Sequence, residues 1–196
     1  MCLLKRLPYL IALLMLTIST GAVSDNALKI QQVKAELFKS LAKATTQQDG
    51  RAAEHEVWQF WFSLSPTAEI RISLDAGIER REAYDYEASE KHFDQVVEAA
   101  PEYSEGYNQR AFIHFLRENY DASLVDLEKA LELEPNHFGA LTGVYHILRI
   151  QNRHRAAMSM LQKAVTIHPW IQERGALPRE LWPESYRDIH DPELKI

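Results

Sequence analysis

The chain has 196 residues, a net charge of −6 and 46% hydrophobic residues, enough to form a domain with its own core. The acidic balance excludes a nucleic-acid-binding protein, because such proteins need clustered positive charge. A single cysteine, Cys2, excludes a disulfide framework and a cysteine-based zinc site within one chain.

Residues 1–24 have the pattern of an export signal. Two basic residues precede an apolar run over residues 7–18, and small residues follow the run. This run is shorter than the roughly 20 residues that a membrane span needs. The sequence therefore predicts a signal peptide at 1–24, cleavage before Asp25 and a periplasmic or secreted protein of bacterial type. The alternative is an uncleaved membrane anchor, and only then do we expect contact with a membrane.

The sequence predicts a helical hairpin over residues 25–66. Apolar positions recur at helical spacing through 27–48 and again through 51–64, and Asp49-Gly50 between them is a turn signal. We expect Ser65-Pro66 to begin the next helix, with proline in the first turn. Two interpretations stay open for the hairpin: a degenerate repeat that caps a stack of helices, or an unrelated N-terminal hairpin.

A regular repeat organises the chain from residue 67 to 169. Prolines recur every 34 positions, at Pro101, Pro135 and Pro169, and the residues before them agree. Large apolar residues stand eight before each proline, and small or branched residues stand five and twelve before it, a spacing that lies on one face of a helix. In that order the residues are Phe93, Leu127 and Leu161; Val96, Ala130 and Ala164; Ser89, Ser123 and Ala157.

The other half of each repeat is also helical. In the last repeat, Asn136 is a good helix N-cap and Asn152 lies where the helix should stop. Each unit is then a pair of antiparallel helices that buries its apolar face only against a neighbour. The sequence predicts an all-α fold, an α-solenoid of about three helix pairs. These pairs are expected at 67–101, 102–135 and 136–169.

The repeat resembles the tetratricopeptide repeat (TPR). The segment from Tyr120 to Asn136 looks very like the second helix and turn of that family, and Tyr107 to Ala111 is similar to a common first-helix variant. The resemblance covers about residues 70–169. The last unit departs from the family in having Tyr145 where Gly or Ala is preferred.

The resemblance implies a protein-binding groove, because the first helices of successive units line a concave surface in this family. It implies a non-enzymatic module that binds a peptide or protein segment there. The candidate lining residues are Leu74, Ile78, Arg81, Asn108, Phe112, Phe115, Thr142, His146 and Arg149. The helix that carries Phe112 and Phe115 is apolar on two faces and must bury both or bind something. The alternative is that these two rings pack against neighbouring helices or the tail.

One ligand class of the family does not fit this sequence. Members that grip the terminal carboxylate of a chaperone carry basic and asparagine residues at fixed groove positions. The corresponding residues here are Leu74, Ile78, Thr142 and His146. We therefore do not expect a chaperone terminus as the partner.

No pattern in the sequence predicts catalysis. There is no glycine-rich phosphate loop and no Gly-x-Ser-x-Gly turn. The eight histidines lack the spacing of a metalloprotease, and histidines of this kind are mostly structural. We expect no enzyme activity, no cofactor and no metal site.

The sequence predicts an irregular tail over residues 170–196, because three prolines there break helices. We expect Trp170 and Trp182 to cover the exposed face of the last repeat. Two other interpretations stay open: the tail fills the groove until a partner displaces it, or it orders only on binding. The alternative function is a structural subunit of a larger envelope assembly, docked through its outer face or this tail.

Overall fold

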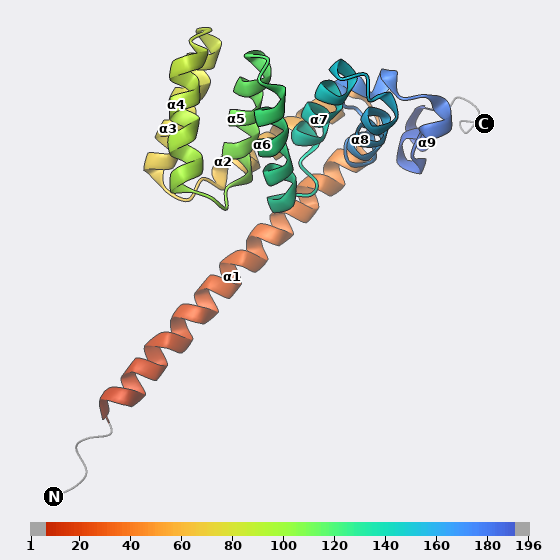
Figure 1. Ribbon diagram of the computed structural model, residues 1–196. Helices are drawn as coiled ribbons and strands as arrows, with labels where there is room; N and C mark the ends of the chain where they lie inside the picture. The colour runs from red at the N-terminus through yellow and green to blue at the C-terminus, as the bar shows by residue number, and fades with distance from the viewer. Residues whose placement is uncertain (1–6, 191–196) are drawn as a thin grey trace, which may run out of the picture.

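The computed structural model describes the chain path over residues 7–190 and the side chains of 25–190; over this range the fold is all helical (Figure 1). The predicted signal peptide at 1–24 and its cleavage site lie outside the described side chains, as does the end of the predicted tail. Within the part that the structure describes, no helix combines the length and the hydropathy of a membrane span.

Along the described chain four helix pairs follow one another, and a tail of short helical turns comes after them. The pairs are α1 (Leu7–Lys43) and α2 (Gln47–Ser63), α3 (Ala68–Glu82) and α4 (Tyr86–Ala99), α5 (Ser104–Leu116) and α6 (Tyr120–Leu133), and α7 (Phe138–Ile150) and α8 (His154–Ile167). The tail holds the 3₁₀ turns η1 (Gln172–Ala176) and η2 (Arg179–Leu181) and then α9 (Glu184–His190). The predicted all-α solenoid of three helix pairs with an N-terminal hairpin and an irregular tail is confirmed.

The turn inside each of the three units has one geometry. Tyr84, Glu118 and Asn152 occupy the same position of successive repeats and have positive φ angles of 60°, 61° and 59°. The residue after each of them donates its N–H to a carbonyl in the last turn of the preceding helix; in the second unit Asn119 donates to His114 at 2.8 Å. This left-handed ending satisfies carbonyls at the helix end and reverses the chain.

The prolines mark the turns between units. Each lies second in a four-residue turn closed by a backbone hydrogen bond, the position that suits its fixed φ angle. The carbonyls of Ala100, Glu134 and His168 accept these bonds from Tyr103, His137 and Ile171 at 3.0, 3.0 and 3.1 Å. The prolines thus recur at a regular interval because the same turn recurs between successive units.

The repeated apolar positions form the core. Phe93 and Leu161 are fully buried and Leu127 nearly so, and the small residues three positions later are fully buried as well. Buried hydroxyls hold the helices of a pair together, because Ser123 donates to the carbonyl of Ala111 at 2.8 Å and Ser89 makes the equivalent bond one unit earlier.

Three predicted helix ends are wrong by a few residues. Helix α2 begins before Asp49-Gly50, because the Thr46 hydroxyl oxygen caps it by accepting from the N–H of Asp49 at 3.1 Å. Helix α3 begins at Ala68, because Thr67 caps it and Pro66 precedes the cap. The cap of α7 is His137, one residue after the predicted Asn136.

The α1–α2 hairpin lies across the stack instead of continuing it. In Figure 1 it passes along the side where α5 and α7 begin, and the end of α1 reaches α8. The Trp61 ring stacks on His137 with ring centroids 4.0 Å apart, and its backbone carbonyl accepts a hydrogen bond from the Tyr103 hydroxyl at 3.1 Å. Lys34 of α1 forms an ion pair with Glu134. The hairpin therefore contacts the second and third units at once.

The tail packs on α8 and on the hairpin. The Gln162 side chain in α8 donates to the carbonyl of Leu181 at 2.7 Å, and Tyr186 is buried in the main core. Trp182 also packs against this core, and its indole N–H donates to the carbonyl of Leu177 at 3.0 Å. Trp170 instead covers the turn of the hairpin, where its indole N–H donates to the carbonyl of Ala44 at 2.8 Å.

Candidate functional site

A pocket of about 400 Å³ lies between α2 and the first helices of the three units. Its wall combines aromatic and aliphatic side chains with a few polar groups. The lining residues are Trp58, Phe62, Arg81, Asn108, Gln109, Ala111, Phe112, Phe115, Ser123, Leu127, Gly139, Thr142, Gly143, His146 and Glu173. Phe112 stays 44% exposed. A mostly apolar concavity with a few polar groups is the usual form of a binding site.

The structure brings most of the candidate residues together. Those that line this pocket are Arg81, Asn108, Phe112, Phe115, Thr142 and His146. Arg149 lies next to it, in a shallower pocket that also contains Ile150 and shares Phe115 and His146.

The other two candidates belong to the core. Leu74 is fully buried in a cluster with Ile70 and Phe93, and Ile78 is half-buried and packs against the same cluster. The placement of Leu74 in the groove is therefore corrected. Both side chains lie on the face of α3 that meets α4 and α5, where the apolar surface of the first unit is buried.

Three lining residues come from outside the repeats. Trp58 and Phe62 belong to α2, and Glu173 belongs to η1. A Cβ atom on Gly139 would stand 2.6 Å from the Trp58 ring, so this ring rests on α7 only because the helix has a glycine there. The periodicity of the repeats carries no signal for such contacts, because it describes neither the hairpin nor the tail.

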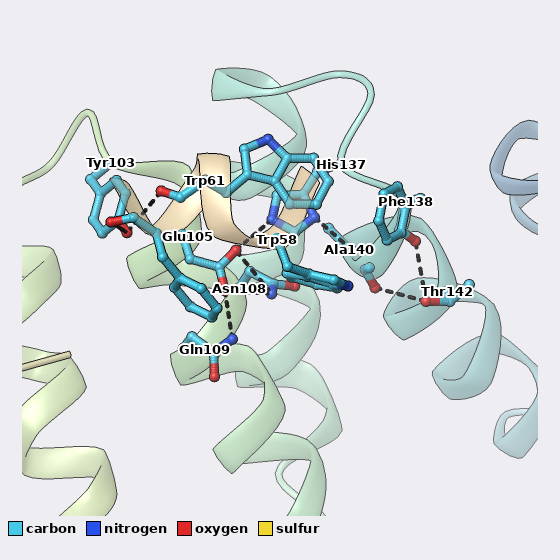
Figure 2. Close-up of polar contacts among 12 residues, drawn as sticks. Trp58, Trp61, Tyr103, Glu105, Asn108, Gln109, His137, Phe138, Ala140 and Thr142 are labelled. Carbon is cyan, nitrogen blue, oxygen red and sulfur yellow. Dashed lines mark hydrogen bonds and ion pairs between the residues drawn. The ribbon is translucent and has the colours of Figure 1, made fainter. Parts of the chain in front are cut away.

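A buried polar network supports the floor of the pocket (Figure 2). Glu105 and His137 are both fully buried. The N–H of Ala140 donates to Nδ1 of His137 at 3.2 Å, so the ring proton is on Nε2, which donates to Glu105 at 2.9 Å. Gln109 also donates to Glu105, at 2.5 Å. The buried carboxylate is thus held by neutral donors, and the network fixes α5 against the start of α7.

Arg81 joins this network from α3. Its guanidinium donates to the side-chain oxygen of Gln109 and lies over the Phe112 ring, 5.2 Å from the centroid. Burial lowers the pKa of Arg81 and outweighs the opposite effect of Glu82 and Glu105. The Arg81 guanidinium is therefore only partly solvated, and its positive charge is incompletely compensated by water.

A second polar pair stands where the tail meets the groove. Nε2 of His146 and the Glu173 carboxylate are 2.9 Å apart, and this hydrogen bond lowers the pKa of Glu173. Of the tail residues that the structure describes, only Glu173 lines the pocket. This part of the tail therefore closes one end of the groove without filling it.

The remaining histidine contacts are dispersed. His168, fully buried, lies 3.4 Å from Glu54 of α2, and burial lowers the pKa of His114 near Asp126. Across the described residues, no three His, Cys, Asp or Glu side chains converge as ligands of a metal would. The arrangement supports binding through surface shape and charge.

Comparison with known proteins agrees with the fold. Residues 104–137 match the sequence model of the tetratricopeptide repeat. The chain is 27% identical over 134 residues to a TPR repeat-containing protein of Rhizobium etli, a match over 68% of this chain and 65% of that protein. It is 36% identical over 64 residues to the tetratricopeptide repeat protein 36 homolog of Nematostella vectensis, over 33% and 35% of the two chains. The chain thus spans less than two thirds of either relative.

A solved structure has the same fold. The TPR2B domain of yeast Sti1, in its complex with pHsp70, superposes with a TM-score of 0.52 at 21% identity, over 63% of this chain and 97% of that one. All these likenesses are to proteins or domains with tetratricopeptide repeats, and they support that fold for this chain.

Proposed function

We propose that this protein is a non-enzymatic interaction module that holds a peptide or protein segment in the groove between α2, α3, α5 and α7. The observation that carries the proposal is the pocket of about 400 Å³, in which the exposed Phe112 ring stands beside polar groups. The complex of the TPR2B domain of yeast Sti1 with pHsp70 supports binding by a domain of this fold.

The groove is suited to binding because its walls are already fixed. The network of Glu105, Gln109 and His137 holds α5 and α7 in register, and the hairpin adds Trp58 to the same wall. A preorganised surface loses little conformational entropy when a segment binds, so more of the contact energy appears as affinity. The protein would thus act by presenting apolar and charged groups at fixed spacing.

Position-specific photocrosslinking tests the proposal. A benzophenone amino acid replaces Phe112 in the groove or Val125, which is 66% exposed on α6. We expect an adduct from position 112 that Phe115→Ala weakens, because Phe115 lines the same pocket. An adduct from position 125 that forms without one from 112 would contradict groove binding and support a subunit docked through its outer face.

We also propose that the protein works in the cell envelope after export. The basic, apolar and small-residue pattern of residues 1–24 supports this location. N-terminal sequencing of the protein isolated from its own cells tests it, with a chain that begins at Asp25 as the expected result. A chain that still begins at Met1 would contradict cleavage.

A further inference from the structure

One position of the repeat faces the groove in each of the three units. Arg81, Phe115 and Arg149 occupy this position, in the last turns of α3, α5 and α7. Arg81 and Phe115 line the main pocket, and Phe115 and Arg149 line the adjoining one. Since the two pockets share Phe115 and His146, a segment that crosses the units meets arginine, phenylalanine and arginine in succession.

Arg81 has no carboxylate partner at ion-pairing distance within residues 25–190. Of its five N–H donors, one is used by the neutral amide of Gln109. Arg110 in the next unit shows the contrast, because Asp126 and Asp94 accept from it at 2.7 and 3.0 Å, and these bonds raise its pKa. The charge of Arg81 is thus available to a ligand where that of Arg110 is taken.

Arg149 also has no carboxylate partner within the described residues. It is exposed, donates to the Tyr145 hydroxyl at 3.0 Å and forms no ion pair with a carboxylate of the described chain. The carboxylate that does line the groove, Glu173, is already held by His146. The chain as a whole is acidic, with a net charge of −6, yet the unpaired charges of its groove are positive.

We infer that the groove takes an acidic segment of a protein partner, in which two carboxylate side chains flank a bulky apolar one. The carboxylates would meet Arg81 and Arg149, and the apolar side chain would rest on Phe115. Packed helices lie roughly 8–10 Å apart, so α3 and α7 are separated by about 16–20 Å. An extended chain advances about 3.3 Å per residue, so the two acidic residues are expected about five or six positions apart. This inference rests on the proposed function of the groove.

Selection from a displayed library of random dodecapeptides tests the inference. The bait is the wild-type chain, and the comparison bait carries Arg81→Gln and Arg149→Gln. The control carries Arg80→Gln and Arg155→Gln, an equal loss of charge at exposed positions outside the groove. We expect wild type and control to enrich two acidic residues around an apolar one, and the groove variant to retain only the apolar preference. Peptides from the wild-type selection should bind this variant about tenfold more weakly.

The outcomes separate this inference from the proposed function. Peptides that bind through Phe112 and Phe115 but show no acidic enrichment would overturn the inference and leave groove binding intact. Failure to select any peptide that Phe115→Ala weakens would overturn both. Should the double variant fail to fold, the salt dependence of wild-type binding decides, because pairs between exposed charges weaken at high ionic strength and apolar contacts do not.

Discussion

The stack of three units and the α1–α2 hairpin are built from the same kind of element but are held by different contacts. In the stack, each helix packs against neighbours close in sequence, and one set of turns and buried residues recurs in every unit. The hairpin is held by contacts between distant residues, among them Trp61 with His137 and Lys34 with Glu134. Regular local packing defines the stack, and individual long-range contacts define the place of the hairpin.

The largest expected effect comes from removing the ring that joins the two regions. Trp61 is 1% exposed, and Trp61→Ala leaves a cavity against His137, so we expect the free energy of unfolding to fall by about 3–5 kcal/mol. Urea denaturation measures the loss. Leu161→Ala, inside the third unit, is the comparison and should cost about 2–5 kcal/mol.

Hydrogen exchange shows which helices Trp61→Ala destabilises. In Trp61→Ala we expect faster exchange at the beginnings of α5 and α7 as well as in α2. If α5 and α7 kept their protection while α2 lost it, the hairpin would be an independent appendage and the comparison would fail.

A smaller effect is expected from Gly139→Ala, where the hairpin rests on the stack. The added Cβ atom would stand 2.6 Å from the Trp58 ring, and such overpacking costs about 1–3 kcal/mol, while alanine regains about 1 kcal/mol of helix propensity. We expect a net loss of about 1 kcal/mol in urea denaturation. Gly175→Ala is the control, since nothing lies within 4 Å of its added Cβ. A stabilised Gly139→Ala protein would show that the Trp58 contact is dispensable.

Acid should weaken the attachment of the hairpin. The contact with Nε2 of His168, 3.4 Å away, holds the pKa of Glu54 below its ordinary value of 4.5, so this carboxylate stabilises the fold above that pH. The contribution is lost as the pH falls through the lowered pKa, and partial exposure limits it to about 0.5–1 kcal/mol. Unfolding from about pH 5 to pH 3 should therefore be less pH-dependent in Glu54→Gln. Glu102→Gln, at an exposed position, is the control; equal slopes in both variants would exclude this role for Glu54.

The smallest effect lies in the turns of the stack and is stabilising. Tyr84 and Glu118 adopt φ angles near +60°, where glycine avoids the steric cost of a side chain. We expect Tyr84→Gly and Glu118→Gly each to add about 0.5 kcal/mol, seen as a higher Tm. Asn152→Gly should change little, because asparagine tolerates this conformation better. A lower Tm for both glycine variants would mean that the side chains of Tyr84 and Glu118 stabilise the turns.

The sequence predicts the repeated part of the fold well. The apolar residues eight and five positions before each proline are buried as expected, because the helical period and the interval of the repeat both constrain them. Phe112 and Phe115 are groove residues implied by the resemblance to the tetratricopeptide repeat, and both line the pocket. In the first unit the resemblance implies Leu74 as a groove residue, whereas the structure buries this side chain in the core.

The remainder depends on contacts that no local pattern encodes. Trp58 and Phe62 lie in the groove because α2 crosses the stack, a placement set by the gap at Gly139 and by the His137 ring, both of which belong to the third unit. The cap of α7 is likewise set by tertiary structure: Nδ1 of His137 is free to accept because its Nε2 donates to Glu105. Neither feature is visible in the periodicity of the sequence.

The hydrogen bond between Trp170 and Ala44 joins the tail to the turn of the hairpin, across 126 positions of the sequence. An open row of repeats can lose its terminal units one at a time, whereas the parts that the hairpin and the tail hold together are expected to melt in a single step. During synthesis the hairpin leaves the ribosome first, but its packing partners in the third unit are made last. Until then Trp58 and Trp61 lack the His137 and Phe138 rings against which they pack in the folded chain, and exposed apolar rings of this kind favour aggregation.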